Sequence, residues 1–252
     1  SRLGHGHDAT LMSFKRGDGL LAAYECSSDD TLIVVGGNGR VYSVAVDQLP
    51  SARGDGKPIT SFIDFEVGSG IAGYLVGADS QSVVLANTQG LGLACTIKNL
   101  KARVRAGKTF MLLDEGASML APVMVHEAET RLACLSAEGR VLVFALDELR
   151  RLADGGKGVR LMDLNPGETL TSVVPVTDEG LVVRGTRGSS AKAKTIVRGE
   201  FERLNAHRAR KGKEPEVRFV VEAIEAIAKP AAEPAGNQPA TPSTSAPTAA
   251  AG

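Results

Sequence analysis

The chain has 252 residues, 43% of them hydrophobic, which is enough for one large all-β domain or two ordinary domains. The 29 Lys and Arg balance 29 Asp and Glu, so any role with nucleic acid or membranes requires a local charged patch. No apolar run reaches the ~18 residues of a membrane span, and no secretory signal opens the chain. The three cysteines, Cys26, Cys95 and Cys134, form no CxxC pair, which argues against a disulfide framework or a zinc site, and their apolar, strand-like contexts predict buried, inert thiols. We therefore expect a cytoplasmic protein without a cofactor.

Short apolar runs separated by turn residues predict strands along most of the chain, and helical periodicity is weak. Residues 1–18 are polar and predict at most one edge strand. The expected strands are 20–26, 31–35, 41–46, 59–65, 71–76, 83–86, 93–97, 110–113, 119–125, 132–135, 141–146, 159–164, 170–176, 181–184, 195–197 and 217–227. A short helix is expected within the basic stretch 199–213. The Ala-, Pro-, Thr- and Ser-rich residues 229–252 are expected to be disordered.

A repeated motif organises the chain: a glycine turn, a strand, a leucine and then a basic glycine loop. The leucine follows the turn glycine after 10 residues in three copies, as Gly39 and Leu49, Gly90 and Leu100, and Gly139 and Leu149. A glycine-lysine pair then places its lysine 8 residues after the leucine, at Lys57, Lys108 and Lys157. A looser fourth copy begins at Arg187-Gly188. The period of about 50 residues, with four short strands per unit, predicts a radial all-β array of about five blades. We expect the N-terminal segment to complete a blade with the C-terminal strand, which removes an open sheet edge.

Basic residues concentrate in the loops after the glycine turns. Residues 98–108 contain five Lys and Arg and no acid, and residues 184–213 contain ten against two acids. A radial array would place equivalent loops on one rim, with acids such as Glu25, Asp29, Asp30, Asp178 and Glu179 elsewhere. A single loop of this kind is more often an ordinary solvated surface, but four loops in register favour a basic girdle. Such a girdle would neutralise phosphates without reading bases.

No motif for catalysis or metal binding stands out. The four histidines lack the spacing of metal ligands, and His5 and His7 beside Asp8 are interpreted as a terminal turn. Residues 155–158, Gly-Gly-Lys-Gly, lack the spacing of a phosphate-binding Walker loop. The three tyrosines lie in strand patterns and are expected to serve in packing.

The stretches GRVYSVAVDQLPSARGDGKPIT, TQGLGLACTIKNLKARVRAGK and AEGRVLVFALDEL resemble the C-terminal domain of the A subunit of bacterial DNA topoisomerase IV. The A subunit of gyrase carries a related domain. The resemblance implies a β-pinwheel over residues 1–228, which is a propeller-like array whose neighbouring blades exchange strands, followed by the tail 229–252. It also implies a non-catalytic domain that binds and bends duplex DNA on a basic outer rim. The family's domain presents this DNA to the cleavage core, and the enzyme decatenates and relaxes DNA.

The implied partners are duplex DNA, bound without sequence preference, and, in the full-length protein, a second A subunit together with the B subunit of topoisomerase IV. The isolated domain is expected to be a nucleoid-associated monomer that binds no membrane. The QRRGGKG box of gyrase is present only as the GGKG half at 155–158, which argues against tight wrapping of DNA. The matched motifs and the remaining basic loops give these candidate DNA-binding residues: Arg53, Lys57, Lys98, Lys101, Arg103, Arg105, Lys108, Arg150, Arg151, Lys157, Arg160, Lys192, Lys194, Arg208, Arg210 and Lys211.

Two other functions are compatible with the residues alone. The zero net charge and the apolar run VRFVVEAIEAIA would suit a propeller-like scaffold that binds protein partners. A propeller enzyme would need carboxylates or histidines converging on a central channel, and the repeats do not supply them.

Overall fold

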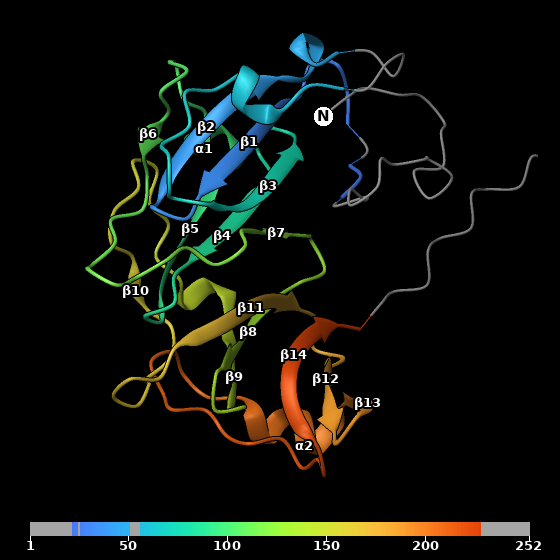
Figure 1. The fold of residues 1–252 in the computed structure, drawn as a ribbon. Helices are drawn as coiled ribbons and strands as arrows, with labels where there is room; N and C mark the ends of the chain where they lie inside the picture. The colour runs from blue at the N-terminus through green and yellow to red at the C-terminus, as the bar shows by residue number, and fades with distance from the viewer. Residues whose placement is uncertain (1–21, 25, 51–55, 228–252) are drawn as a thin grey trace, which may run out of the picture.

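The computed structural model describes residues 22–24, 26–50 and 56–227. This part of the chain contains fourteen strands, two short α-helices and three 3-10 turns (Figure 1). The strands are β1 (Thr31–Gly36), β2 (Arg40–Ala45), β3 (Ile71–Gly77), β4 (Ser82–Ala86), β5 (Leu91–Thr96), β6 (Lys108–Thr109), β7 (Val123–Val125), β8 (Arg131–Ser136), β9 (Val141–Ala145), β10 (Val159–Arg160), β11 (Leu170–Val176), β12 (Leu181–Arg187), β13 (Ser190–Ile196) and β14 (Val220–Ala226). The helices are α1 (Ile97–Leu100) and α2 (Arg198–Leu204), and the 3-10 turns are η2 (Val46–Gln48), η3 (Ile59–Ser61) and η4 (Leu146–Glu148).

The strands form four antiparallel sheets. In Figure 1 the first lies at the top, the second below it, and the third and fourth side by side at the bottom. Their orders are β3-β1-β2-β6, β10-β5-β4-β7, β11-β8-β9 and β13-β12-β14. The all-β array of repeated units is therefore confirmed, with a glycine-turn hairpin in each sheet. No helix in the described ranges is long and apolar enough to cross a membrane.

The central strands β1, β4 and β8 read as continuous apolar runs because both of their faces are buried. In β1, Ile33 and Val35 point into the core shared with the second sheet, whereas Leu32 and Val34 point into a core on the other side. The same alternation in β4 and β8 divides their side chains between successive cores. Successive strand residues face opposite sides of a sheet, so each of the first three sheets is held between two cores, whereas the fourth sheet packs on one core through one face.

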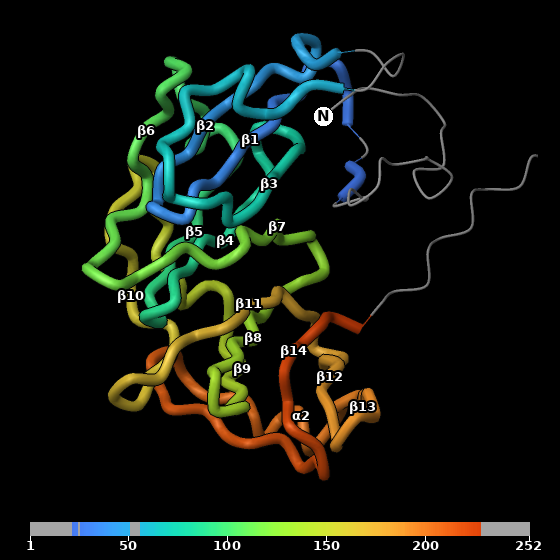
Figure 2. Tube along the Cα trace, viewed as in Figure 1, coloured from blue at the N-terminus to red at the C-terminus, as the bar shows by residue number. Residues whose placement is uncertain are grey.

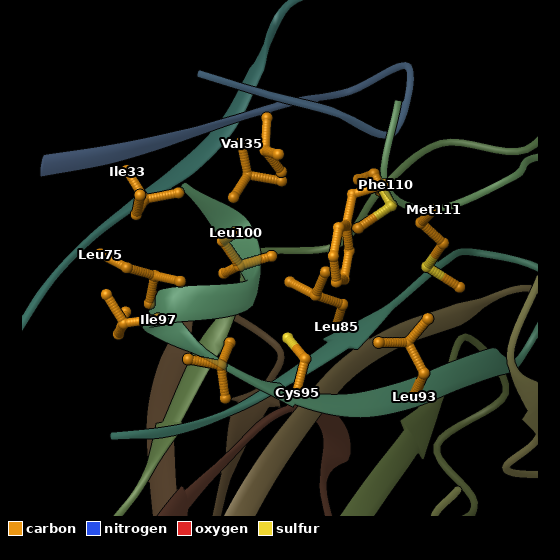
Figure 3. Packing of buried hydrophobic residues seen from close by; sticks show 13 residues of the cluster. Ile33, Val35, Leu75, Leu85, Leu93, Cys95, Ile97, Leu100, Phe110 and Met111 are labelled. Carbon is orange, nitrogen blue, oxygen red and sulfur yellow. The ribbon is translucent and has the colours of Figure 1, made fainter. Parts of the chain in front are cut away.

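The repeated leucine closes the core between one unit and the unit before it. It is the last residue of α1 and of α2 and directly follows η4, and Leu100, Leu149 and Leu204 are buried in the three successive inter-sheet cores. Figure 3 shows Leu100 at the end of α1, among side chains that include Ile33 of the first sheet. In the fourth unit Leu204 has the same place in the core, although it lies 16 residues after Gly188 and not 10, so the spacing in the sequence did not reveal it.

Neighbouring sheets exchange strands. The two-residue strand β6 follows α1 of the second unit but pairs with β2 of the first, and β10 follows η4 of the third unit but pairs with β5 of the second. In the third sheet the equivalent place beside β9 holds isolated bridges from Asn205 and Lys213. Exchange of this kind is the arrangement expected of a β-pinwheel.

The structure corrects the register of the basic glycine loops. Lys108 lies opposite Val41, and the residue at the same place in the next unit is Val159, opposite Gly92. The glycine equivalent to Gly107 is therefore Gly158, two residues later than the predicted Gly156. The additional residues exist because the chain first pairs with Phe110, whose carbonyl accepts a hydrogen bond from the Gly156 amide at 2.8 Å.

Other sequence predictions were wrong or too long. Residues 59–65 form η3 and a turn instead of a strand, since Pro58 precedes the turn and the apolar residues fold onto the outer core of the first sheet. The expected strand 110–113 is not formed, and the pairing falls on the two residues before it, Lys108–Thr109. The expected strand 159–164 is shortened to Val159–Arg160, because the chain leaves the sheet after two paired residues. Residues 22–24 and 26 of the first expected hairpin lie outside any strand.

The cysteines divide into two kinds. Cys95 and Cys134 are buried in β5 and β8, as their apolar context predicted. Burial raises the pKa of Cys95 to about 12 and also raises the pKa of Cys134, so neither thiol ionises readily. Cys26 is exposed, which corrects the expectation of three buried thiols.

Several expectations lie outside the described residues: the N-terminal strand, its pairing with the C-terminal segment to make a fifth blade, His5 and His7, and the tail 229–252. The C-terminal apolar run itself is β14, which pairs with β12 in the fourth sheet.

Candidate nucleic-acid interface

Three stretches of chain, 101–109, 150–160 and 205–213, carry the exchange between sheets and are called the exchanged segments below. Each begins after the buried leucine and runs beside the second hairpin strand of the preceding sheet. The contact near its start recurs: the Ala102 amide donates to Ser43 Oγ at 2.7 Å, the Leu152 amide to the Ala94 carbonyl and the Ala206 amide to the Val143 carbonyl, both at 2.9 Å. The exchanged segments therefore occupy equivalent places in successive units.

Each exchanged segment carries four Lys or Arg residues, and the three together contain one acid, Asp154. The cations are Lys101, Arg103, Arg105 and Lys108, then Arg150, Arg151, Lys157 and Arg160, and finally Arg208, Arg210, Lys211 and Lys213. Figure 2 shows the segments following one another along the left side of the molecule, around β6, around β10 and below β9. Their order along one side produces the local basic surface that the net charge conceals.

The opposite charge gathers at four turns, 27–30, 78–81, 126–130 and 177–180, which precede β1, β4, β8 and β12. These acidic turns contain no Lys or Arg. Their acids are Asp29, Asp30, Asp79, Glu127, Glu129, Asp178 and Glu179. In Figure 1 the turns that end β3, β7 and β11 lie on the right, away from β6 and β10. Acids therefore recur at these turns while cations recur on the exchanged segments. The separation is incomplete, because Asp79 contacts Lys101 of the first exchanged segment, and three other acids, Asp64, Asp114 and Asp163, also pair with cations of the segments.

The predicted site residues fall into three groups. Eleven of them lie on the exchanged segments, as given above. Lys57 precedes η3, Lys98 lies on α1 and Lys192 on β13, all with exposed side chains, and Lys194 is half-buried on β13. Lys194 Nζ contacts Glu200 Oε2 at 2.7 Å and the Glu216 carbonyl at 2.9 Å, so it ties α2 to the fourth sheet. Arg53 lies outside the described residues.

Four cations of the exchanged segments have surface ion pairs. The pairs are Lys101 with Asp79 at 2.5 Å, Arg105 with Asp64 at 3.6 Å, Lys157 with Asp114 at 2.7 Å and Arg160 with Asp163 at 3.4 Å. Exposed pairs of this kind contribute little to stability, so a phosphate can replace the carboxylate at small cost.

The other cations of these segments have no acid within ion-pair distance among the residues that the structure describes, and Arg103, Arg150, Arg151 and Arg210 are also exposed. Lys108 Nζ donates to the Asn99 carbonyl at 2.6 Å and lies 5.4 Å from the centre of the Phe110 ring. Lys213 was missing from the predicted residues. The position of Lys213 in the fold identifies it as a candidate, because it lies opposite Val141 in the same way that Lys108 lies opposite Val41.

A buried ion pair lies beneath the third exchanged segment. The Arg140 guanidinium donates to Glu168, and the two side chains are 11% and 1% exposed. Burial favours the neutral acid, but hydrogen bonds from Ser136, the Asn165 amide and Arg140, with the charge of Arg140, outweigh it and lower the pKa of Glu168. Glu168 is therefore charged at neutral pH and fixes the guanidinium in place.

Comparison with known proteins gives one consistent family. Residues 30–65 and 130–177 match the family model described as the DNA gyrase C-terminal domain, beta-propeller. The A subunit of DNA topoisomerase 4 from Escherichia coli K12 is 34% identical over 168 residues, which are 67% of this chain and 22% of that protein. The corresponding protein of Neisseria gonorrhoeae is 30% identical over 223 residues, covering 84% and 28%. The chain thus spans about a quarter of the length of the curated relatives it matches.

The solved structures that match have the same fold. The E. coli ParC C-terminal domain aligns with a TM-score of 0.77 and 27% identity, covering 88% of this chain and 91% of that one. The DNA gyrase A C-terminal domain aligns with a TM-score of 0.62 at 18% identity, covering 86% and 73%, a likeness of fold alone. With the exchanged strands, these matches confirm the predicted β-pinwheel.

Proposed function

Because this chain belongs to the family of C-terminal domains found in the A subunits of topoisomerase IV, we propose that it is the DNA-binding accessory domain of such an enzyme. In this role it captures a duplex along the three exchanged segments, bends it over the row of units and presents it to the cleavage core. The enzyme then decatenates DNA and relaxes supercoils. The domain supplies no catalytic residue, and breakage of DNA and hydrolysis of ATP belong to other parts of the enzyme.

The observation that carries the proposal is the recurrence of cations in structurally equivalent places. Twelve Lys and Arg residues lie on three equivalent segments along one side, with Asp154 as their only acid. Repetition of positive charge along one surface suits the phosphate backbone of a duplex, which has one charge per ~1.7 Å of its axis. Nothing in the segments resembles a helix or ribbon that would enter the major groove, so binding independent of sequence follows.

The assembly and location in this proposal are those of the family. The enzyme is completed by a second A subunit together with the B subunit, and it works on DNA in the cytoplasm, at the nucleoid. The rival idea of a protein-binding scaffold loses its main support, because the apolar C-terminal run is used within the molecule. Val221 and Ile224 of β14 are buried in the core between the third and fourth sheets.

The test is the affinity for a linear duplex, a relaxed circle and a positively supercoiled circle, measured across a salt series. We expect steep salt dependence and a preference for the supercoiled circle. Arg150→Glu with Arg151→Glu should weaken binding by ~10- to 100-fold, because each lost phosphate contact changes the salt slope by about 0.9. Arg187→Glu with Arg218→Glu is the matched control, since these arginines are also exposed but lie outside the exchanged segments.

Two results would contradict the proposal. If wild-type protein bound no DNA even at low salt, it would not be a DNA-binding domain. If the control pair weakened binding as much as the Arg150 and Arg151 pair, the exchanged segments would not be the binding surface.

A further inference from the structure

An arginine directly after the turn glycine holds the backbone of the exchanged segment in the first sheet. Arg40 begins β2, beside β6, which belongs to the second unit. Its Nη2 donates to the carbonyls of Ala106 at 2.8 Å and Gly107 at 3.3 Å, and its Nη1 donates to Thr109 Oγ1 at 3.3 Å. One guanidinium thus fixes three groups on the stretch that contains Lys108 and follows Arg103 and Arg105.

The third unit repeats the device with Arg140. Its Nη1 donates to the Lys211 carbonyl and, at 3.4 Å, to the Asp163 carbonyl, whereas its Nη2 binds Glu168. Glu168 Oε2 also accepts the Asn165 amide at 2.7 Å, so the carboxylate is anchored in its own loop. The exchanged segment is held here at Lys211, between the cations Arg210 and Lys213.

The second unit has no arginine at this position, so it shows the fold without this contact. Leu91 stands at the position of Arg40 and Arg140, one residue after the turn glycine. A hollow of about 280 Å³ lies beside it, lined by Gln89, Lys157 and Arg160 among others. Lys157 and Arg160 meet surface acids there. Leucine at this place is therefore compatible with the fold.

We propose that Arg40 and Arg140 are positioning residues for DNA binding: they act on the duplex through the exchanged segments that they hold. This inference rests on the proposed function. A loop that is ordered before binding loses less conformational entropy when it meets its partner. The rigid fork of a guanidinium, which lysine does not have, suits two carbonyls at once. The cations flanking these carbonyls are thereby fixed in phosphate-binding positions.

The test compares Arg40→Leu and Arg40→Lys with wild-type protein. Arg40→Leu follows the precedent of Leu91, and Arg40→Lys keeps the charge but loses the fork. We expect both to weaken duplex binding by ~10-fold at 0.1 M salt and to lower the salt slope by about 1 to 2. Amide hydrogen exchange at residues 106–108 should accelerate in both variants, while circular dichroism and the melting of the rest of the domain stay close to wild type.

A second variant tests the third unit. Arg140→Leu alone would leave Glu168 buried without its partner, so it is combined with Glu168→Gln to keep the domain folded. The double variant should lose affinity as Arg40→Leu does and exchange faster around residue 211. Glu168→Gln alone keeps the arginine and an oxygen that can accept its hydrogen bond, so this matched control should lose clearly less affinity than the double variant.

The outcomes separate the inference from the function beneath it. Wild-type affinity in Arg40→Leu would overturn the positioning role. Wild-type affinity in Arg40→Lys, beside a weakened Arg40→Leu, would overturn it too, because charge alone would then suffice. Wild-type protein that binds no duplex would overturn the proposed function itself, and the inference with it.

Discussion

Lys108 lies directly opposite Val41, a residue of the preceding unit, at the point where β6 pairs with β2. Lys213 lies opposite Val141 in the same way, two sheets further along. This cross-unit pairing fixes both the fold and the candidate interface, because the residues that join one sheet to the next are also the residues that carry the positive charge.

The glycine that begins each exchanged pairing is required for close approach of the backbone. Gly158 has φ of 80°, and a Cβ there would lie 2.4 Å from the Gly92 carbonyl oxygen. We expect Gly158→Ala to lower the free energy of unfolding by ~3 kcal/mol or more, measured by urea denaturation. Gly167→Ala is the control, because Gly167 has φ of 81° and nothing within 4 Å of its Cβ position. It should cost only the backbone strain, ~1 kcal/mol. Equal losses would show that the approach to Gly92 does not matter.

The repeated leucine is predicted to be a main source of stability. Leu100 is fully buried between the first and second sheets, where Figure 3 shows it among large side chains. Leu100→Ala should lower the free energy of unfolding by ~2–5 kcal/mol through lost burial and the cavity left behind. Leu112→Ala removes the same atoms from a residue that is 56% exposed, so it should cost less than ~1 kcal/mol. A small loss at Leu100 would contradict the proposed closure of the core.

Glu168 gives the stability a defined dependence on pH. Its pKa in the folded protein is below the ordinary 4.5, so the unfolded chain takes up the proton more readily. The stabilising contribution is complete above about pH 4.5 and is lost as pH falls through the lower, folded pKa. Wild-type protein should therefore exceed Glu168→Gln in urea midpoint at neutral pH, with the difference shrinking in acid. Glu115→Gln, at an exposed site, should show no such trend, and a difference independent of pH would refute the prediction.

The positions of two acids relative to the exchanged segments predict unequal effects of removing one negative charge. Asp154 lies on the second exchanged segment and Glu127 on an acidic turn, and both are exposed. Asp154→Asn should raise affinity for a duplex by ~3-fold at low salt, because the charge lies next to the bound phosphates. Glu127→Gln should change it by less than ~1.5-fold, since salt screens charges more than ~10 Å away. A larger gain at Glu127 would place the DNA on the other side of the molecule.

The sequence by itself determined the repeated unit, most of its strands and the presence of basic loops. Those features are local: a glycine turn needs positive φ, and a strand buried on both faces needs a continuous apolar run such as residues 32–35. Only the tertiary structure decided which residues meet between units. The pairing of Lys108 with Val41, the two-residue shift at Gly158 and the place of Lys213 depend on contacts between residues some 50 or more apart, which no spacing rule records. Arg40 and Arg140 read as ordinary strand residues in the sequence, because their function depends on carbonyl groups supplied by another unit.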